Sequence, residues 1–458
     1  MDSATHLQEL MEFLRIPSVS TLPERDADCR RAAEWVASAL RALGCREVAF
    51  LASESHPVVW GVGPPVPGAP TLLIYGHYDV QPPDPLGEWV TPPFEPAVRD
   101  GKLFGRGTAD DKGQVFCLLK AIEAAGRPAV NFRFLIEGEE ECGSRALLDL
   151  LRREPERARA DAVLIADMAY VAPRWPAVYT ALRGVCYAEI TVRTAKSDLH
   201  SGEFGGAAPN AHEELVRLLG RLKGADGVIH VPGLYAAVAR PSKAELAAWR
   251  RLPFREASFL TNRVQAKALV GLKRYSVLER LWALPTFEIH GIKGGFTGVG
   301  AKTVIPAEAM AKVSLRLVPN QRLKTVERQL AAAVRRYTPK YVTARVEFLH
   351  GAEPAQVRVS HPAFALLDRA FREVVGRGTV PVRAGGSIPV VPALGRHGGP
   401  VLLTGIGLPD DRLHAPNEKL DLDQLWDGIK VFGRFYELLA ETTNTEGPGR
   451  STVRRSRR

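Results

Sequence analysis

Residues 71–79 read Thr71-Leu72-Leu73-Ile74-Tyr75-Gly76-His77-Tyr78-Asp79. The first five form a short, mostly apolar run, which is typical of a buried strand. Two polar side chains, His77 and Asp79, follow at once, and Gly76 lets other parts of the backbone come close. Ligands of open α/β sheets bind just beyond the carboxyl ends of the strands. The stretch therefore predicts a strand of such a sheet and a candidate site at its end.

Polar side chains also follow other predicted strands and turns. Seven acids and one imidazole come after predicted strands or a turn. Glu137, Glu139, Glu140 and Glu141 follow the strand at 131–136, Asp167 follows the strand at 162–166, His414 comes after the strand at 400–404, and Asp110 and Asp111 follow the turn at 105–107. With no cysteine among them, such ligands suit zinc, manganese or cobalt. Each residue alone also has a structural explanation, such as a turn cap or a helix cap. Their joint occurrence at strand ends favours a metal site.

Helices and strands alternate in two separate parts of the sequence. The first part has predicted strands at 48–51, 58–61, 71–75, 131–136 and 162–166 and helices at 32–43, 113–125 and 145–153. The second part has a helix at 361–375, a strand at 400–404 and a final helix at 422–439. Such alternation predicts a sheet with helices packed on its faces.

The intervening segment has a different pattern. Apolar and polar residues alternate from Val185 to Thr194, as in a strand with one exposed face. Further strands are expected at 287–292, 309–317 and 344–349, with helices at 211–222 and 323–337 and a mostly helical stretch at 242–280. We therefore predict an α/β fold in which a domain with a mixed, helix-flanked sheet, residues 1–180 and 356–441, is interrupted by an inserted α+β domain, residues 181–355. The first of these also carries the candidate site and is the expected catalytic domain if that site is an active site.

The composition excludes several classes of protein. Of 458 residues, 45% are hydrophobic and 24% are charged, which is ordinary for a globular protein. The sequence contains neither an apolar run of about 18 residues nor a signal-peptide pattern, so we expect a cytoplasmic protein with no membrane partner. The five cysteines include no CxxC pair, which argues against a disulfide framework or a thiolate zinc site.

Part of the net charge of +10 comes from the C-terminal end. Residues 446–458 contain five arginines and one glutamate, a net of +4, which leaves about +6 for the rest. This composition predicts a disordered basic tail at 442–458, with a tether to anionic surfaces as its alternative function. The rest of the sequence lacks a basic stripe with interleaved aromatic residues, so we expect no nucleic-acid partner.

Three long motifs resemble the M20 family of metallopeptidases, and within it the branch of carnosinases and cytosolic non-specific dipeptidases. They are Ile74-Tyr75-Gly76-His77-Tyr78-Asp79-Val80-Gln81-Pro82, Gly101-Lys102-Leu103-Phe104-Gly105-Arg106-Gly107-Thr108-Ala109-Asp110-Asp111-Lys112-Gly113 and Glu137-Gly138-Glu139-Glu140-Glu141-Cys142-Gly143-Ser144. Shorter motifs at 198–202, 302–306, 314–319 and 385–389 extend the resemblance, which runs from the first helix to about Leu439.

The resemblance implies two divalent metal ions per subunit, with zinc expected and manganese or cobalt as alternatives. By motif, His77 and Asp167 hold one ion, Glu141 and His414 hold the other, and Asp110 bridges them. The bond between Asp110 and Asp111 is expected to be cis. Asp79 orients the imidazole of His77, and Glu140 is the general base. A water shared by the two ions gives its proton to Glu140, attacks the scissile carbonyl, and the proton then passes to the leaving amine.

The resemblance also assigns roles to the inserted domain, which is expected to act as a lid and as the dimerisation surface. His200 is expected to reach into the neighbouring subunit's site and stabilise the oxyanion. Arg316 is expected to hold the C-terminal carboxylate of the substrate, and Thr303 and Ser387 to contact the same end. The branch usually has a glutamate where this chain has Ala384. This difference affects the expected substrate specificity, but none of the expected metal ligands is lost.

The sequence thus predicts a homodimeric metallopeptidase that cleaves dipeptides or similar small amides with a free C-terminal carboxylate. Alternatives within the same family are an N-acyl or N-carbamoyl amino acid amidohydrolase and a short-peptide carboxypeptidase. A non-catalytic metal-binding protein is an alternative of another class, and it would require a damaged base or ligand.

Overall fold

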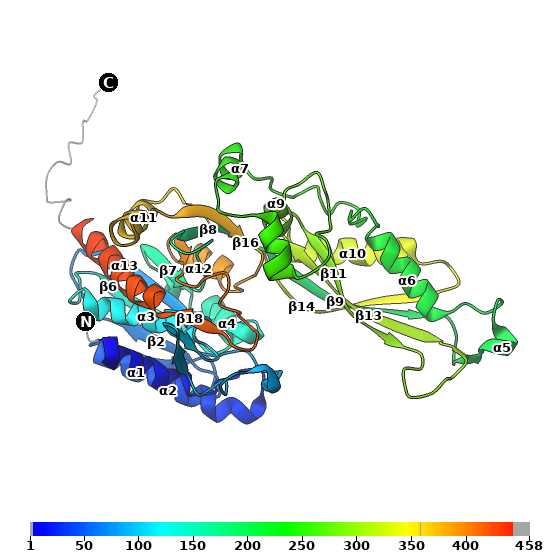
Figure 1. Cartoon of the computed structure of the whole chain (residues 1–458), viewed down its shortest axis with the longest axis horizontal. Helices are drawn as coiled ribbons and strands as arrows, with labels where there is room; N and C mark the ends of the chain where they lie inside the picture. The colour runs from blue at the N-terminus through cyan, green and yellow to red at the C-terminus, as the bar shows by residue number, and fades with distance from the viewer. Residues whose placement is uncertain (1–2, 358, 443–458) are drawn as a thin grey trace, which may run out of the picture. The chain divides into compact units, whose positions relative to one another are not determined.

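The computed structural model describes residues 3–357 and 359–442, so the predicted tail lies outside the described residues from position 443 onward. The chain divides into two compact units (Figure 1). Unit 1 comprises residues 1–180, 357–381 and 393 onward, and unit 2 comprises residues 181–356 and 382–392. The expected boundaries assigned all of 356–441 to the catalytic domain, whereas residues 382–392 cluster with unit 2.

Unit 1 contains a mixed six-stranded sheet in the order β1-β2-β6-β3-β7-β17. Its strands are β1 (Glu47–Leu51), β2 (Val58–Val62), β6 (Asn131–Glu137), β3 (Thr71–His77), β7 (Ala162–Ala166) and β17 (Val401–Thr404). β1 and β2 run antiparallel to their neighbours, and the other four strands are parallel. The register pairs His77 with Glu137 and Thr404 with Ala166, so four carboxyl ends meet at one edge of the sheet.

Helices cover this sheet, as the alternating pattern predicts. They are α1 (Ser3–Leu14), α2 (Asp26–Ala42), α3 (Lys112–Ala124), α4 (Arg145–Arg153), α11 (Pro362–Val375), α12 (Val391–His397) and α13 (Leu422–Glu441). α2 packs on β1 and β2, α3 packs on β3 and β7, and α13 packs on α3 and α11. The ends of α11 follow from its sequence, because Pro362 has the φ that a first helical turn needs and Gly376 ends the helix at φ +78°.

A second, small sheet of unit 1 was not foreseen from the sequence. It has the order β18-β5-β4, with β4 (Ala97–Arg99), β5 (Lys102–Phe104) and β18 (Lys419–Asp421). β5 pairs with β18 across more than 300 residues of sequence, with Phe104 opposite Lys419. The pairing brings the segment that follows β5 next to the segment that precedes β18.

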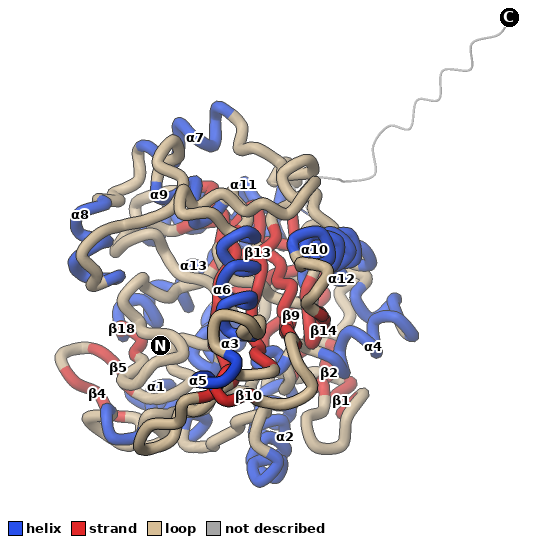
Figure 2. Tube along the Cα trace, turned by 90° about the vertical axis from the view of Figure 1, so that its right-hand side faces the viewer, coloured by secondary structure: helices blue, strands red, loops and turns tan. Residues whose placement is uncertain are grey.

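Unit 2 is built on an antiparallel sheet in the order β11-β13-β9-β14. Its strands are β11 (Thr286–Gly294), β13 (Glu308–Leu317), β9 (Gly184–Arg193) and β14 (Thr343–Ala352). Burial alternates along β9, which confirms the predicted half-exposed strand. Helices α6 (Ala211–Leu222) and α10 (Leu323–Tyr337) cover one face over an apolar core (Figure 2). With unit 1, this arrangement confirms the predicted α/β fold class with an α+β insertion.

Short elements complete the fold. They are β8 (Ala177–Leu182), β10 (Leu199–His200), α5 (Ser201–Phe204), β12 (Val304–Ile305), β15 (Ala355–Gln356) and β16 (Val380–Ala384). β10 pairs with β12, and β8 lies between β15 and β16. Within residues 3–357 and 359–442, no helix has the length and hydropathy that a bilayer span requires.

The stretch 242–280 is helical in little more than half of its residues, and its helices are short, separate pieces. It contains α7 (Lys243–Arg250), α8 (Glu256–Ser258), a π-helical turn (Phe259–Val264) and the start of α9 (Val277–Trp282). Pro253 follows α7 and disfavours its continuation. Ser276 starts a new helix with a capping box to Glu279. Between these helices, Gly271 has a φ of +101°.

Candidate metal centre

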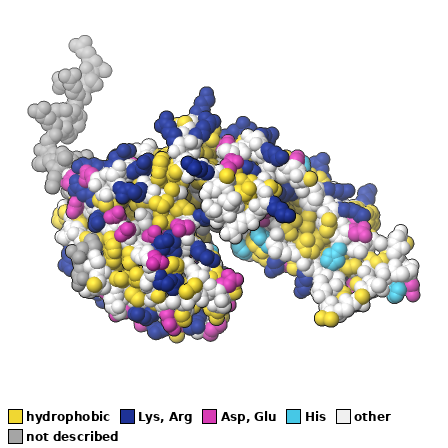
Figure 3. Space-filling model, in the orientation of Figure 1, with side chains coloured by type: hydrophobic (Ala, Val, Ile, Leu, Met, Phe, Trp, Pro, Cys, Tyr) yellow, Lys and Arg dark blue, Asp and Glu magenta, His cyan; other side chains and the backbone are white. Residues whose placement is uncertain are grey.

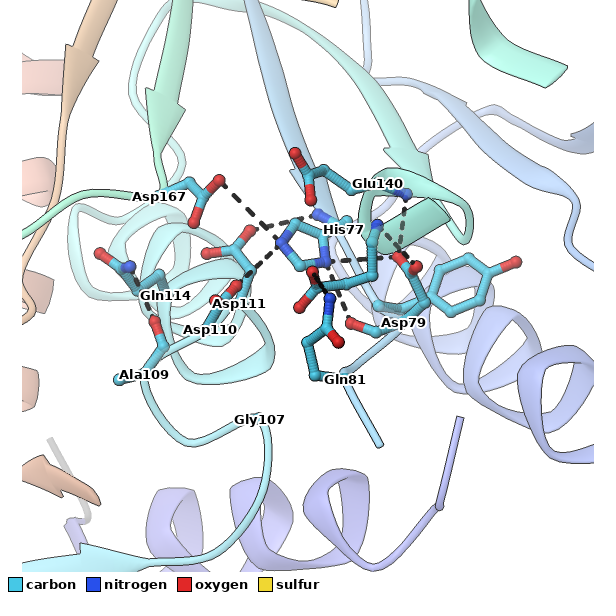
Figure 4. Close-up of polar contacts among 12 residues, drawn as sticks. His77, Asp79, Gln81, Gly107, Ala109, Asp110, Asp111, Gln114, Glu140 and Asp167 are labelled. Carbon is cyan, nitrogen blue, oxygen red and sulfur yellow. Dashed lines mark hydrogen bonds and ion pairs between the residues drawn. The ribbon is translucent and has the colours of Figure 1, made fainter. Parts of the chain in front are cut away.

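The site of unit 1 is organised around His77, the last residue of β3, whose side chain is fully buried. Its Nδ1 lies 3.0 Å from the backbone oxygen and 3.3 Å from Oδ1 of Asp79. Its Nε2 faces the other way, 3.2 Å from Asp110 Oδ1 and 4.0 Å from Asp167 Oδ2 (Figure 4). Asp79 presents only acceptor oxygens to Nδ1, so Nδ1 is the nitrogen that donates, and Nε2 faces the two carboxylates, where a metal-binding imidazole would present its lone pair.

A second group of ligands adjoins the first. His414 Nε2 lies 2.9 Å from Asp110 Oδ2 and 3.4 Å from Glu141 Oε1. The two carboxylate oxygens of Asp110 therefore face different imidazoles. Candidate ligand atoms of His77, Asp110 and Asp167 lie within 4.8 Å of one another, and so do those of Asp110, Glu141 and His414. All five ligands that the motifs predicted come together, with Asp110 shared between the groups.

Backbone geometry places Asp110 between the two groups. Asp110 precedes α3 and is joined to Asp111 by a cis peptide bond, as the resemblance predicted. Asp111 accepts a hydrogen bond from the backbone N–H of His77, 3.1 Å away, which ties this turn to the end of β3. A Cβ at Gly113 would lie 1.9 Å from the oxygen of Thr108, so only glycine allows the turn to fold this tightly.

Glu140 follows β6 in a short 3-10 turn, Glu140–Cys142, and its carboxylate points toward His77 and Asp167 (Figure 4). Burial raises the pKa of Glu140 well above its ordinary value, and the negative charges of Asp167 and Glu141 add to the effect. Burial likewise raises the pKa of Asp167, reinforced by Asp111 and Asp110. These carboxylates are costly to ionise together unless positive charge lies among them.

The donor atoms fit divalent cations. His77 Nε2 and Glu141 Oε1 are buried and lack a hydrogen-bond partner within the described residues. The pKa of His414 is raised to about 10, mainly by Asp110 and then by Glu141, so this acidic cluster favours a positive charge beside it. Imidazole nitrogens and carboxylate oxygens without thiolates suit zinc, manganese and cobalt. The side chain of His414 is 53% exposed, which leaves this side of the cluster open.

Asp79 does more than orient His77. Its Oδ1 accepts a hydrogen bond from the backbone N–H of Glu140 at 3.3 Å, and its Oδ2 accepts one from that of Glu141 at 3.1 Å. Ser20 also donates to Oδ2, at 2.7 Å. One buried carboxylate thus fixes the imidazole of one group and the turn that carries the expected base.

Sequence reasoning missed two polar partners of this cluster. Gln81 Nε2 donates to Glu141 Oε2 at 2.7 Å and so holds that ligand in place (Figure 4). Ser20 reaches Asp79 from the loop between α1 and α2. Gln81 lies within a recognised motif, but an amide is not a typical metal ligand. Ser20 lies 59 residues from its partner, and no local pattern signals such a contact.

The four residues expected to bind substrate all belong to unit 2. His200 lies in β10 opposite Val304 of β12, and the backbone N–H of Ser201 donates to the oxygen of Thr303 at 3.2 Å. His200 and Thr303 are therefore neighbours. Arg316 lies on β13, where burial lowers the pKa of its guanidinium. Ser387 follows β16 and is half-buried.

An aromatic stack near Arg316 was not predicted. The ring of Tyr187 lies between the rings of His290 and His350, with centroids 5.1 and 4.9 Å away. His290 also contacts the hydroxyl of Ser314 at 2.8 Å. The positive charge of Arg316 adds to burial in lowering the pKa of His350, so the stack and the guanidinium are near neighbours. Figure 3 shows histidine side chains on the surface of unit 2.

The chain is similar to known proteins over most of its length. Residues 73–438 match peptidase family M20/M25/M40. The Cys-Gly metallodipeptidase dug1 of Schizosaccharomyces pombe is 34% identical over 457 residues, with 95% of each chain covered. The Beta-Ala-His dipeptidase of Homo sapiens is 33% identical over 382 residues, 81% of this chain and 75% of that one. The solved structure of the dipeptidase Dug1p from Saccharomyces cerevisiae has a TM-score of 0.83 at 28% identity and covers 96% of both chains.

Proposed function

Because the chain belongs to peptidase family M20/M25/M40, we propose that it is a metal-dependent dipeptidase that hydrolyses the peptide bond of small substrates with a free C-terminal carboxylate. The observation that carries this proposal is the pair of ligand groups that share Asp110, with Glu140 beside them. None of the expected ligands is missing, and the expected base is present, which argues against a non-catalytic metal-binding protein.

Each residue of the centre has a defined task. His77 and Asp167 would hold one divalent ion, Glu141 and His414 the other, and Asp110 both. Bound at these positions, the ions would lower the pKa of a water molecule and polarise the scissile carbonyl. The carboxylate of Glu140 takes a proton from the attacking water and delivers it to the leaving nitrogen. Asp79 keeps His77 in the tautomer with a free Nε2 and holds the backbone of Glu140 in place.

Substrate-binding roles are proposed for residues of unit 2. The guanidinium of Arg316 binds the substrate's C-terminal carboxylate through two parallel hydrogen bonds, with Thr303 and Ser387 at the same end. His200 stabilises the oxyanion in the neighbouring subunit of a homodimer. The proposal includes zinc as the metal at both positions and the cytoplasm as the location of the enzyme. The relatives named above support small dipeptides as the substrate class.

A metal analysis followed by a substrate panel tests the proposed function. Purified enzyme is expected to contain two divalent ions per chain and to hydrolyse dipeptides such as Cys-Gly or β-Ala-His. N-acyl amino acids, N-carbamoyl amino acids and tripeptides serve as competing substrates in the same assay. Turnover of the acylated or carbamoylated compounds alone would replace the dipeptidase with an amidohydrolase. Preferred turnover of tripeptides would indicate a short-peptide carboxypeptidase.

Arg316→Lys is expected to raise KM for a dipeptide by roughly tenfold or more with little change in kcat. Lysine keeps the positive charge but cannot form the two parallel hydrogen bonds of a guanidinium to a carboxylate. The control is the same dipeptide with its C-terminus blocked as a carboxamide. Wild type and variant should bind this substrate, whose C-terminus is uncharged, about equally, so an equal loss on both substrates would contradict the assigned role.

Mixing two inactive variants tests whether His200 acts in the neighbouring subunit. Glu140→Ala and His200→Ala homodimers should each be nearly inactive. In a mixed dimer, the subunit with Glu140 intact receives His200 from its partner, so one of the two sites is complete. Random mixing of equal amounts should restore about a quarter of wild-type activity. If His200 serves its own subunit, no mixed dimer contains a complete site and activity stays at the level of the homodimers.

A further inference from the structure

The two ligand groups of the metal centre are supported in different ways. In the first, His77 ends β3, and Asp167 follows β7 and donates its backbone N–H to Thr404 at 3.1 Å. Both ligands unique to this group are anchored by neighbouring parallel strands. In the second, Glu141 lies in a 3-10 turn and His414 lies in a loop at a φ of +59°. The shared ligand, Asp110, also lies in a loop. Asp111 and Asp79 tie the turns of Asp110 and Glu141 to the end of β3, but the loop of His414 needs another source of rigidity.

That source is Glu418, four residues after His414 and 0% exposed. Its Oε2 accepts hydrogen bonds from Arg106 Nη1 at 2.6 Å and from the backbone N–H of Gly107 at 3.2 Å. Its Oε1 accepts from the backbone N–H groups of Ala109 and Asp110, at 3.0 and 3.1 Å. One carboxylate thus binds four donors of the loop that carries Asp110, while its own backbone belongs to the loop that carries His414.

Arg106 extends the same contact toward Glu141. The residue is 1% exposed, and its Nη2 donates to the backbone oxygen of Pro82 at 3.1 Å. The residue before Pro82 is Gln81, whose amide donates to Glu141 at 2.7 Å. The ion pair between Arg106 and Glu418 therefore joins the loops of Asp110 and His414 directly, and it is linked to Glu141 through the segment of Gln81 and Pro82.

Stability alone does not account for this pair. A buried ion pair is often no more stabilising than apolar side chains of similar volume, because both charges lose their hydration. Here five hydrogen bonds involve the two side chains, although Arg106 Nε has no partner within the described residues. Three of the five come from or reach backbone groups within one residue of Asp110 or Gln81. Most of these hydrogen bonds therefore hold backbone that lies next to the proposed metal ligands, which is the arrangement expected of a positioning pair.

We propose that Arg106 and Glu418 are positioning residues for one of the two ions, the one held by Asp110, Glu141 and His414. Loosening the pair strongly lowers the affinity for that ion. The affinity for the other ion changes little, because its ligands His77 and Asp167 lie at the ends of sheet strands. The inference rests on the proposed dinuclear centre and adds to it an asymmetry between the two ions that depends on two residues outside the set of ligands.

The test is Glu418→Gln in the metal-loaded enzyme, which removes the charge and two acceptor positions at nearly constant volume. Holoenzyme is equilibrated in buffers of graded free Zn²⁺, and bound zinc per chain is measured by atomic emission. Wild type should lose its ions in two steps. In the variant, the step in which the more weakly bound ion dissociates should move to at least about tenfold higher free zinc (the weaker step). The step in which the more tightly bound ion dissociates should move by less than about threefold (the tighter step). Excess zinc should restore much of the lost kcat.

Glu245→Gln is the matched control. Glu245 pairs in unit 2 with Arg383, which is 3% exposed and donates through Nε at 3.0 Å and Nη2 at 2.8 Å. This variant removes the carboxylate of another buried arginine pair, and both zinc steps should stay unchanged. Arg106→Lys is a second test that does not depend on Glu418→Gln remaining folded. Lysine keeps the charge but cannot reach Glu418 and Pro82 together, and the weaker step should again shift more than the tighter one.

The possible results are distinct. The positioning role would be overturned if both zinc steps shifted equally in Glu418→Gln or Arg106→Lys, or if neither step shifted. The proposed function would still stand. A wild-type enzyme that binds fewer than two ions at every zinc concentration would overturn the dinuclear centre itself, and this inference with it.

Discussion

Glu140→Ala is expected to lower kcat on a dipeptide by at least about a hundredfold while metal content stays at the wild-type level. Glu140 points toward His77 and Asp167 but belongs to neither ligand group. Removing its carboxylate takes away the group proposed to move the proton from water to the leaving nitrogen, and all five proposed ligands remain. Steady-state kinetics and metal analysis of the same preparation check both parts of the expectation.

The neighbouring Glu139 provides the control for this variant. Its Oε2 accepts a hydrogen bond from the backbone N–H of Ala146 at 2.8 Å, so its carboxylate is engaged with the start of α4. Glu139→Gln retains an acceptor there, and kcat should remain within about threefold of wild type. Unchanged turnover in Glu140→Ala would remove Glu140 from the mechanism. Loss of metal along with activity would instead make it a ligand.

The parts of the fold that carry the site follow from local sequence patterns. The apolar run at Thr71–Tyr75 and its counterparts at 131–136 and 162–166 became β3, β6 and β7, because short apolar runs between turn signals are fully buried strands. Parallel pairing then places their carboxyl ends at one edge, where His77 and Asp167 lie. The resemblance to known motifs added the remaining ligands, and the structure brings them together.

The contacts that hold those ligands could not be predicted in the same way. Glu418 and Arg106 lie 312 residues apart in the sequence. Glutamate and arginine are usually exposed, so neither residue type predicts that the two side chains are buried together. Their pairing depends on the small sheet in which β5 meets β18, whose three-residue strands are too short for a periodic signal. The division of the stretch 242–280 into short helices was not predicted for a related reason. Its apolar residues suggest helix, but Pro253 and Gly271 divide it into short pieces.

Removing the metal ions with a chelator is expected to abolish dipeptide hydrolysis, with a loss of at least about a hundredfold, and adding zinc, manganese or cobalt back should restore it. The reason is that, in the proposed mechanism, the ions held by the acids and imidazoles of the centre lower the pKa of the attacking water. Without them Glu140 has no acidic water from which to take a proton. Activity that survives complete removal of bound metal, verified by atomic emission, would contradict the proposed mechanism. A chelator that has been saturated with zinc beforehand is the control for direct inhibition.

The metal-free enzyme should also become less stable as the pH rises, and this follows from the direction of several pKa shifts. Burial raises the pKa of Asp167 and Glu140 in the folded protein, and it raises the pKa of Glu137 to about 8. For an acid with a raised pKa, the folded state binds more protons than the unfolded state. Unfolding then releases protons, so stability is highest below the unfolded pKa, near 4, and is lost as the pH rises toward the folded pKa.

His414 acts in the same direction. Its folded pKa of about 10, raised by Asp110 and Glu141, gives a contribution that is complete below the unfolded pKa near 6.5 and lost toward pH 10. Burial lowers the pKa of Lys112 to about 7, which acts in the opposite direction over this range, but more groups act in the first direction. Between pH 6 and 8 the melting temperature of the chelated protein should therefore fall, by about 5 °C. Bound ions supply the missing positive charge, so the loaded enzyme should change much less over this range. A metal-free protein with an equally flat profile would mean that these carboxylates do not crowd one another in the folded chain.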